Sequence, residues 1–294
     1  MRHEIARAVQ TALAGQPVPV EEMQAAIGAL MDGLASDVET AALLTALAAK
    51  GETADEIAGA AAAMRARVTR VPARTERLID TCGTGGDRLN TFNISTAAAL
   101  VVAAAGVPVA KHGNRSATSS SGSAEVLQAL GVNIELPPER VADCIDEIGL
   151  GFCYARLLHT AMRHVAPVRS ALGFRTIFNL LGPLTNPAGA QFQLLGTIRN
   201  DLAHKLADAS ARLRAHRTLV VCGHDQLDEV ALWGTTLCLD VQGAAITQSQ
   251  WTAETFGLPE CTVADLQVQS AAESAEMIRG LLANRPGPPR DIVI

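Results

Sequence analysis

Apolar residues recur at helical spacing through residues 1–70, and each set falls on one face of a helix. The two clearest sets are Ile5, Val9 and Leu13, followed by Met23, Ile27, Leu30, Met31 and Leu34. Two capping boxes mark further helix starts, Ser36 with Glu39 and Thr53 with Glu56, because the hydroxyl accepts a backbone N–H while the carboxylate reaches back. Residues 1–70 are therefore predicted to form a small all-helical domain.

Beyond Val71 the pattern changes, and short apolar runs alternate with helical stretches. The predicted strands are Leu78–Cys82, Val107–Ala110, Asn133–Leu136, Gly151–Tyr154, Gln191–Gly196, Leu219–Cys222 and Thr236–Asp240. The predicted helices are Thr96–Ala105, Ser123–Leu130, Glu139–Ile148, Thr160–Leu172 and Asp201–Ala215. Alternation of strand and helix implies right-handed crossovers. The predicted fold class is α/β, with a larger α/β domain over residues 71–294 built on a mainly parallel central sheet.

The last residues have a pattern of their own. Pro286–Pro289 is predicted to be a turn or short linker, and Arg290–Ile294 looks like the start of a strand. We therefore expect this domain to be truncated at its C-terminus.

Composition narrows the function classes. Hydrophobic residues make up 48% of the 294 residues and the net charge is −6, whereas proteins that wrap nucleic acid usually carry a basic surplus. No apolar run approaches the roughly 20 residues that span a bilayer, and the N-terminus has no signal-peptide core. We expect a cytoplasmic enzyme with no nucleic-acid or membrane partner. The six cysteines form no C-x-x-C pair and are predicted to be buried, reduced thiols.

A glycine loop directly follows the first predicted strand. The loop Gly83–Asp87 leads into Asn93–Thr96, which opens an alanine-rich helix. Backbone N–H groups freed by glycine, together with a helix N-terminus, form an anion site. Ser95 or Thr96 is the expected N-cap, and one of these hydroxyls would also serve a phosphate or a metal. The loop lacks the Walker and dinucleotide patterns, and a purely structural turn remains the alternative.

A second polar loop follows the next predicted strand. Lys111–Arg115 brings two cations beside the hydroxyl-rich run Ser116–Ser123, again at the start of a helix. The alternative is a flexible linker with solvated cations. Two such loops on successive strand–helix units indicate a ligand with two phosphate clusters.

Two further sets of residues are candidates. Asp228 and Glu229 follow a predicted strand and offer the oxygen ligands that Mg²⁺ prefers, although most such pairs are solvated surface. Arg169 lies ten residues after His159 in a predicted helix, about 15 Å along the axis. Arg169 would pair with a substrate carboxylate or take part in a structural ion pair.

These motifs, in this order and spacing, resemble the anthranilate phosphoribosyltransferase family, a nucleoside-phosphorylase-like phosphoribosyltransferase family. The resemblance extends from the first helix to the last residues. The motifs that carry it are Gly83–Asp87, Asn93–Thr96, Lys111–Arg115, Gly122–Leu127, Arg175–Pro183 and Leu227–Glu229.

The resemblance implies a role for each motif. Phosphoribosyl pyrophosphate would bind to Gly83, Gly86, Asp87, Thr91, Asn93, Ile94, Ser95, Thr96, Lys111, His112, Gly113, Asn114, Arg115, Ser116, Ala117, Thr118, Ser119 and Ser123. Mg²⁺ would be served by Ser95, Asp228 and Glu229, and anthranilate by Gly83, Asn114 and Arg169 with His112 and His159 nearby. No residue is assigned as a nucleophile or base, because anthranilate is a neutral amine at pH 7 and positioning suffices.

The resemblance also implies a homodimer formed through the helical domain, which part of residues 160–185 would join. The expected reaction gives N-(5′-phosphoribosyl)anthranilate and pyrophosphate in tryptophan biosynthesis. Thr160 and Arg156 depart from the prolines usual near the acceptor, and the family continues past Ile294. A transferase for another aromatic amine, or a non-catalytic nucleic-acid-binding relative, are the alternatives.

Overall fold

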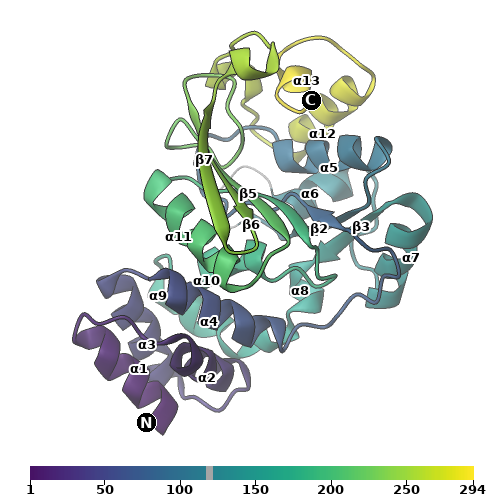
Figure 1. Cartoon of the computed structure of the whole chain (residues 1–294). Coiled ribbons are helices and arrows are strands. Elements are labelled where there is room, and N and C mark those ends of the chain that lie inside the picture. Colours follow the sequence, from purple (N-terminus) through teal and green to yellow (C-terminus); the bar gives the residue numbers. More distant parts are fainter. Residues whose placement is uncertain (117–121) are drawn as a thin grey trace.

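The computed structural model describes residues 1–116 and 122–294. A helical bundle lies at one end of the molecule, and the central sheet separates it from the C-terminal helices at the opposite end (Figure 1). Within the described residues, no helix combines the length and the apolar character needed to cross a membrane.

Four helices build the N-terminal bundle. They are α1 (His3–Leu13), α2 (Val20–Met31), α3 (Asp37–Lys50) and α4 (Ala54–Arg65). Both predicted capping boxes are confirmed. The Glu39 N–H donates to Ser36 Oγ at 3.3 Å, and the Ser36 N–H donates to the Glu39 carboxylate at 2.9 Å. Thr53 and Glu56 make the same pair of bonds at the start of α4.

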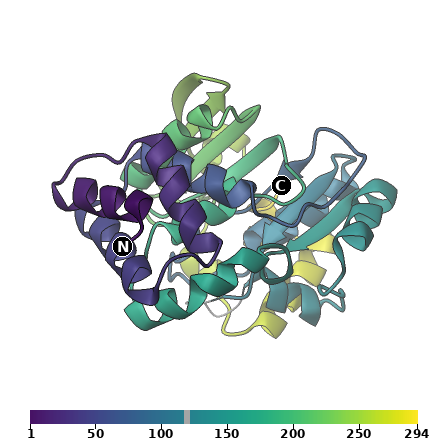
Figure 2. The same ribbon diagram turned by 90° about the horizontal axis from the view of Figure 1, so that it is seen from below.

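The bundle is held by apolar packing and by one buried carboxylate. Its fully buried side chains include Ile5, Met23, Ile27, Leu43, Leu44, Leu47 and Ile57. Glu56 is also fully buried, and it accepts from the Val18 N–H at 2.8 Å and from Lys50 Nζ at 3.0 Å. Seen from below, the N-terminal helices gather on one side of the molecule (Figure 2).

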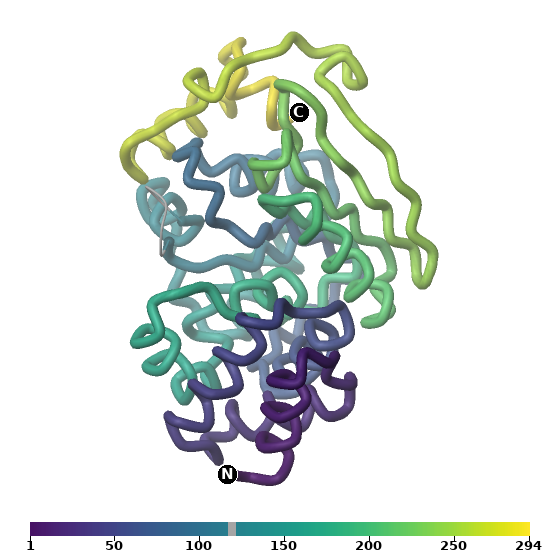
Figure 3. Tube along the Cα trace, turned by 90° about the vertical axis from the view of Figure 1, so that its left-hand side faces the viewer, coloured from purple at the N-terminus to yellow at the C-terminus, as the bar shows by residue number. Residues whose placement is uncertain are grey.

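Seven strands form one sheet in the order β3-β2-β1-β4-β5-β6-β7. They are β1 (Ile79–Asp80), β2 (Val109–Gly113), β3 (Leu150–Tyr154), β4 (Phe192–Gly196), β5 (Arg217–Gly223), β6 (Thr236–Gln242) and β7 (Ala245–Trp251). The first five strands pair in parallel, whereas β6 and β7 pair antiparallel at one edge. The long β6–β7 hairpin runs along the side of the molecule (Figure 3). The prediction of a mainly parallel sheet is confirmed.

Helices cover the sheet and join it to the bundle. They are α5 (Ile94–Ala104), α6 (Ser123–Ala129), α7 (Pro138–Ile148), α8 (Ala155–Leu158), α9 (Ala166–Leu172), α10 (Phe178–Leu181), α11 (Asn200–Arg212), α12 (Ala271–Leu282) and α13 (Pro288–Asp291). Short 3-10 turns are η1 (Thr160–His164), η2 (Gly182–Leu184), η3 (Ala253–Phe256) and η4 (Val263–Leu266). Helix α11 contacts both β5 and α4, so one hydrophobic core continues from the bundle into the sheet.

Three predicted elements are wrong. Residues 133–136 form no strand, and α7 follows them directly. Residues 160–172 do not form one helix, because η1 ends before Val165 and α9 begins at Ala166 with Pro167 in its first turn. His159 and Arg169 are therefore not on a shared helix. Residues 290–294 start no strand, because Pro288 opens α13. Strand β7 and helix α12 are missing from the prediction.

Candidate functional site

The site lies where the strand order reverses. From β1 the chain builds outward to β3 and then returns to place β4 on the other side of β1. In parallel sheets this reversal opens a crevice at the carboxyl ends of the strands. Loops from both sides meet there, because the Thr84 N–H donates to the Gly196 carbonyl at 2.8 Å and the Gly85 N–H donates to Asp228 Oδ2 at 2.7 Å.

The glycine loop packs too closely for side chains. A Cβ on Gly83 would lie 2.7 Å from Asp228 Oδ2 and 3.1 Å from the Gly196 carbonyl oxygen. Gly86 has a φ of +89°, which favours glycine, and the Arg175 guanidinium occupies the space that a Cβ would need. The two glycines therefore let the Asp228 carboxylate and the Arg175 guanidinium approach the loop backbone.

Helix α5 begins with a different cap from the predicted one. Asn93, and not Ser95 or Thr96, is the N-cap, and its Oδ1 accepts from the Thr96 N–H at 3.1 Å and from Ser95 Oγ at 3.3 Å. Lys111 Nζ donates to Ser95 Oγ at 3.2 Å. The Ile94 side chain is buried, so Ile94 can contribute to the predicted anion site only through its backbone.

Three carboxyl groups gather at the same edge. Burial raises the pKa of Asp87 to about 6, with repulsion from Asp228 adding to the effect. Burial, followed by repulsion from Asp228, holds the pKa of Glu229 well above its usual range, and burial also raises the pKa of Asp228. The Ser95 backbone and the buried Lys111 ammonium act in the opposite direction and lower the pKa of Glu229. The predicted metal residues Ser95, Asp228 and Glu229 are therefore brought together, with Asp87 as a third carboxylate.

Two buried histidines form a chain of hydrogen bonds. His112 Nδ1 lies 2.9 Å from the Gly182 carbonyl oxygen, and His112 Nε2 lies 3.1 Å from His159 Nε2. Burial lowers the pKa of His112 to about 4 and that of His159 to about 3, so both rings are neutral. We assign Nδ1–H to His112, which makes its Nε2 the acceptor for His159 Nε2–H. His159 Nδ1 is then an acceptor without a partner among the described residues.

Three residues predicted to bind the substrates lie in different surroundings: Arg169, Asn114 and Arg115. Arg169 stacks on Phe178, with its Cζ 5.4 Å from the ring centroid, and is partly buried. Asn114 is exposed at the end of β2. Arg115 turns toward β3 and α6, where its Nε donates to Tyr154 Oη at 3.2 Å. Roles for these residues in binding a substrate stay predictions.

The remaining predicted residues lie around the two loops. Thr91 pairs with Gln267 in an isolated bridge. Gly113 and Ser123 pack together, because a Cβ on Gly113 would overlap Ser123 Oγ. The Ser116 N–H donates to the Glu125 carboxylate at 3.3 Å. The predicted residues Ala117, Thr118 and Ser119 lie outside the described residues.

Sequence reasoning did not assign roles to three residues of this region. Thr81 Oγ1 accepts from Lys111 Nζ at 3.3 Å and donates to the Ser95 carbonyl at 2.8 Å. Asp80 is fully buried, and Arg175 Nη1 donates to the Gly85 carbonyl at 3.3 Å. Asp80 and Thr81 stand at the end of a strand that leads into a glycine loop, which is the signal that identifies them. Arg175 gave no signal beyond its place in a motif.

The cluster of Asp80, Cys82 and His112 offers ligand atoms within 4.8 Å of one another. The Asp80 oxygens, however, already accept from the His112 N–H at 3.0 Å and from Asn186 Nδ2 at 2.8 Å. The neighbouring Lys111 ammonium repels a cation. We therefore do not assign a metal site here. All six cysteines lie in the described ranges and are free thiols, three of them buried.

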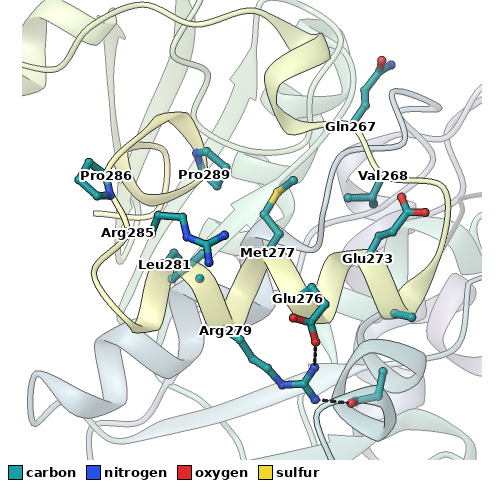
Figure 4. Close-up of a pocket in the computed structure, with 13 residues that line it drawn as sticks. Gln267, Val268, Glu273, Glu276, Met277, Arg279, Leu281, Arg285, Pro286 and Pro289 are labelled. Atoms are coloured by element: carbon teal, nitrogen blue, oxygen red, sulfur yellow. Dashed lines mark hydrogen bonds and ion pairs between the residues drawn. The ribbon is translucent and has the colours of Figure 1, made fainter.

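A cavity of about 610 Å³ lies against α12 and the residues on either side of it, and its wall residue Gln267 pairs with Thr91. Its walls include Met277, Leu281 and Arg285 (Figure 4). Arg279 crosses its lower rim, pairing with Glu276 and donating to the Ala129 carbonyl. No predicted site residue lines this cavity, so it is not the candidate site.

Comparison with known proteins identifies the family. Residues 75–294 match the model of the glycosyl transferase family a/b domain, and residues 6–68 match that of its helical bundle domain. The anthranilate phosphoribosyltransferase of Rubrobacter xylanophilus is 49% identical over 98% of this chain and 84% of its own length. That of Dechloromonas aromatica is 50% identical over 97% of this chain and 84% of its own length.

Solved structures agree with these relatives. The crystal structure of anthranilate phosphoribosyltransferase from Thermus thermophilus is 46% identical, covers 97% of this chain and 85% of its own, and superposes with a TM-score of 0.91. The Saccharomyces cerevisiae enzyme in complex with phosphoribosyl pyrophosphate and Mg is 27% identical, covers 100% of this chain and 86% of its own, and gives a TM-score of 0.89. This chain, with its small helical domain and larger α/β domain, belongs to the anthranilate phosphoribosyltransferase family.

Proposed function

We propose that this chain transfers the 5-phosphoribosyl group from phosphoribosyl pyrophosphate to anthranilate. The products are N-(5′-phosphoribosyl)anthranilate and pyrophosphate, within tryptophan biosynthesis. The observation that carries the proposal is the meeting of the glycine loop with Asp228 at the strand-order reversal, since this places anion-binding N–H groups beside metal-binding carboxylates. The family membership of the chain supports the same reaction.

The gathered oxygens fit Mg²⁺. Asp228, Glu229 and the Ser95 hydroxyl are hard donors, and a divalent cation would stabilise the ionised carboxylates, whose pKa values are raised by burial and, for Glu229, also by repulsion from Asp228. We propose these three residues as its holders, with Asp87 close by. When bound, Mg²⁺ neutralises the charge that develops on the leaving pyrophosphate.

The protein's own residues would then act by positioning. The Gly86 backbone N–H would bind a phosphate group, while the Gly85 N–H is held by Asp228, and the buried Lys111 ammonium adds positive charge nearby. The Arg169 guanidinium, held against Phe178, pairs with the anthranilate carboxylate. The neutral His159, whose buried Nδ1 has no partner among the described residues, would lie beside the acceptor. The amine is neutral at pH 7, so no strong base is required.

The metal assignment is tested by the double variant Asp228→Asn and Glu229→Gln. We expect turnover to fall at least 100-fold at limiting Mg²⁺, measured by the loss of anthranilate fluorescence, because both charged ligands are removed. The matched control is Asp143→Asn with Glu276→Gln, which removes the same charges from exposed positions and leaves turnover unchanged. Wild-type turnover in the first variant would show that the metal is held elsewhere.

The acceptor is tested separately. Thr160 and Arg156 lie near His159, so a related aromatic amine is the second candidate acceptor. Anthranilate should give the highest kcat/KM of a panel of aminobenzoates, and a higher value for another amine would reassign the substrate. A salt-dependent shift of nucleic acid without any transfer would instead favour the non-catalytic relative.

We also propose the domain limits and the assembly. The helical domain would comprise residues 1–70 with part of 160–185, because η1 packs against α2 and α9 packs against α3. Residues 71–294 would form the phosphoribosyl-pyrophosphate-binding domain. A homodimer through the helices is supported by the exposed Leu13 and Val38, and light scattering in solution tests it. A cytoplasmic location completes the proposal.

A further inference from the structure

One residue of the glycine loop is held from both sides. The Gly85 N–H donates to Asp228 Oδ2 at 2.7 Å, and the Gly85 carbonyl accepts from Arg175 Nη1 at 3.3 Å. Asp228 follows β5, whereas Arg175 follows α9, so two segments far apart in sequence meet at this residue. Asp228 is a proposed metal residue, but Arg175 has no role in the proposed function.

The backbone next to Arg175 is fixed by a hydrogen bond and by packing, and the Arg175 side chain extends to the glycine loop. The next residue, Thr176, is buried, and its N–H donates to Asn179 Oδ1 at 2.9 Å. Ile177 then packs in the core shared with the helical bundle. The guanidinium therefore extends from a fixed base to the glycine loop.

The hydrogen bond from Arg175 fixes a peptide that would otherwise turn freely. In a trans peptide the C=O and the following N–H point in opposite directions. Anchoring the Gly85 carbonyl thus turns the Gly86 N–H to the side away from Arg175. Gly85 and Gly86 both have positive φ, +66° and +89°, and glycine permits either orientation of the peptide at little cost. A single bond therefore selects which way an anion-binding N–H points.

We propose that Arg175 is a positioning residue for the pyrophosphate group, which orients the Gly85–Gly86 peptide so that the Gly86 N–H serves the anion. This inference rests on the proposed function. Arg175 acts through the loop backbone, so its contribution requires contact with Gly85 and not merely positive charge. Arg199 provides the comparison, because it is close enough to repel Arg175 electrostatically but pairs with Asp201 at 2.8 Å.

The experiment compares Arg175→Ala, Arg175→Lys and Arg199→Gln in the full chain. We expect Arg175→Ala to raise the KM for phosphoribosyl pyrophosphate about tenfold, which corresponds to the loss of one charge-assisted hydrogen bond. The Kd for inorganic pyrophosphate with Mg²⁺, measured by calorimetry, should rise by the same factor. The KM for anthranilate should stay unchanged. Arg175→Lys, which keeps a donor, should recover part of the affinity, and Arg199→Gln should match the wild type.

Three outcomes would overturn the inference. An unchanged pyrophosphate Kd in Arg175→Ala would show that the bond orients nothing. An equal rise in KM for both substrates, with a lower melting temperature, would show a structural role alone. An equal effect in Arg199→Gln would show that charge, and not contact, matters. If the wild type transfers no phosphoribosyl group, the proposed function fails, but calorimetry with pyrophosphate still tests Arg175 by itself.

Discussion

At the scale of single residues, the site concentrates ionisable groups that are shielded from water. Asp80 is fully buried, and burial raises its pKa to about 6, an effect that Lys111 partly offsets. The histidines beside it show the opposite shift, because burial disfavours the charged form of every group. Each shift links folding to pH, since the folded and unfolded chains then bind different numbers of protons.

The histidine pair should make the protein sensitive to mild acid. The folded pKa of His112, about 4, lies below its usual 6.5, so between these values the unfolded chain binds more protons. Stability is therefore fully present above pH 6.5 and is lost as pH falls toward 4, by about 3 kcal/mol at 1.4 kcal/mol per pKa unit. We expect His112→Gln to flatten this part of the curve of unfolding free energy against pH, measured with urea.

The control is His3→Gln, because His3 is exposed and should leave the pH dependence unchanged. Asp80 contributes with the opposite sign, since its raised pKa favours the folded state at low pH, but it is present in both variants and cancels in the difference. An equally steep acid loss in His112→Gln would contradict the assignment.

At the scale of elements, the helix-capping residues were the most informative part of the sequence. Both capping boxes were predicted from hydroxyl and glutamate spacing alone, and both formed. Strand β7 could not be found in this way, because its residues are nearly all exposed and show no apolar alternation. The break before α9 was missed because the helical spacing of Thr160–Leu172 outweighed the proline signal.

The sequence predicted those parts of the site that lie in loops directly after strands. Parallel strands bring their carboxyl ends to one edge, so the meeting of the loop at Gly83 with Asp228 followed from the order of elements. Hydrogen-bond partners did not follow, because they depend on packing between distant segments. The bond from Arg175 to Gly85 and the approach of His159 to His112 are contacts of this kind.

Glu56 should be the most costly carboxylate to remove from the helical bundle. It accepts from the Val18 N–H, the Thr53 N–H and Lys50 Nζ, and it therefore ties α4 to α3 and to the loop before α2. We expect Glu56→Ala to lower the free energy of unfolding by about 3–5 kcal/mol, because one buried and two partly buried donors lose their acceptor. Urea denaturation measures the change.

Glu39 is the matched control, since it occupies the same capping-box position in α3 but lies near the surface. Glu39→Ala should cost about 1 kcal/mol. Similar losses in the two variants would mean that burial adds nothing to the role of Glu56.

At the scale of the whole molecule, one core crosses the boundary between bundle and sheet. It includes Leu47 of α3, Leu206 of α11 and Val220 of β5 without interruption. A second link is the hydrogen bond from Arg65 Nε to the Leu184 carbonyl at 2.6 Å. The two parts should therefore unfold together.

This continuity is tested with Leu47→Ala, which opens a cavity in the bundle and should cost about 2–5 kcal/mol. Circular dichroism follows the helices, and the fluorescence of Trp233 and Trp251 follows the sheet domain. Both transitions should shift to lower urea by the same amount. A fluorescence midpoint that stays in place while the helical signal shifts would show two independent units.

The Asp228 carboxylate, which accepts the Gly85 N–H, bears on which anions the glycine loop can bind. A phosphate or sulfate ion without a metal would be repelled by the negatively charged Asp228 carboxylate. If Asp228 holds the metal as proposed, an anion that arrives with a divalent cation would offer Asp228 a new partner and release the Gly85 N–H. On the proposed roles of these residues, the unliganded loop would therefore favour an anion that arrives together with a divalent cation.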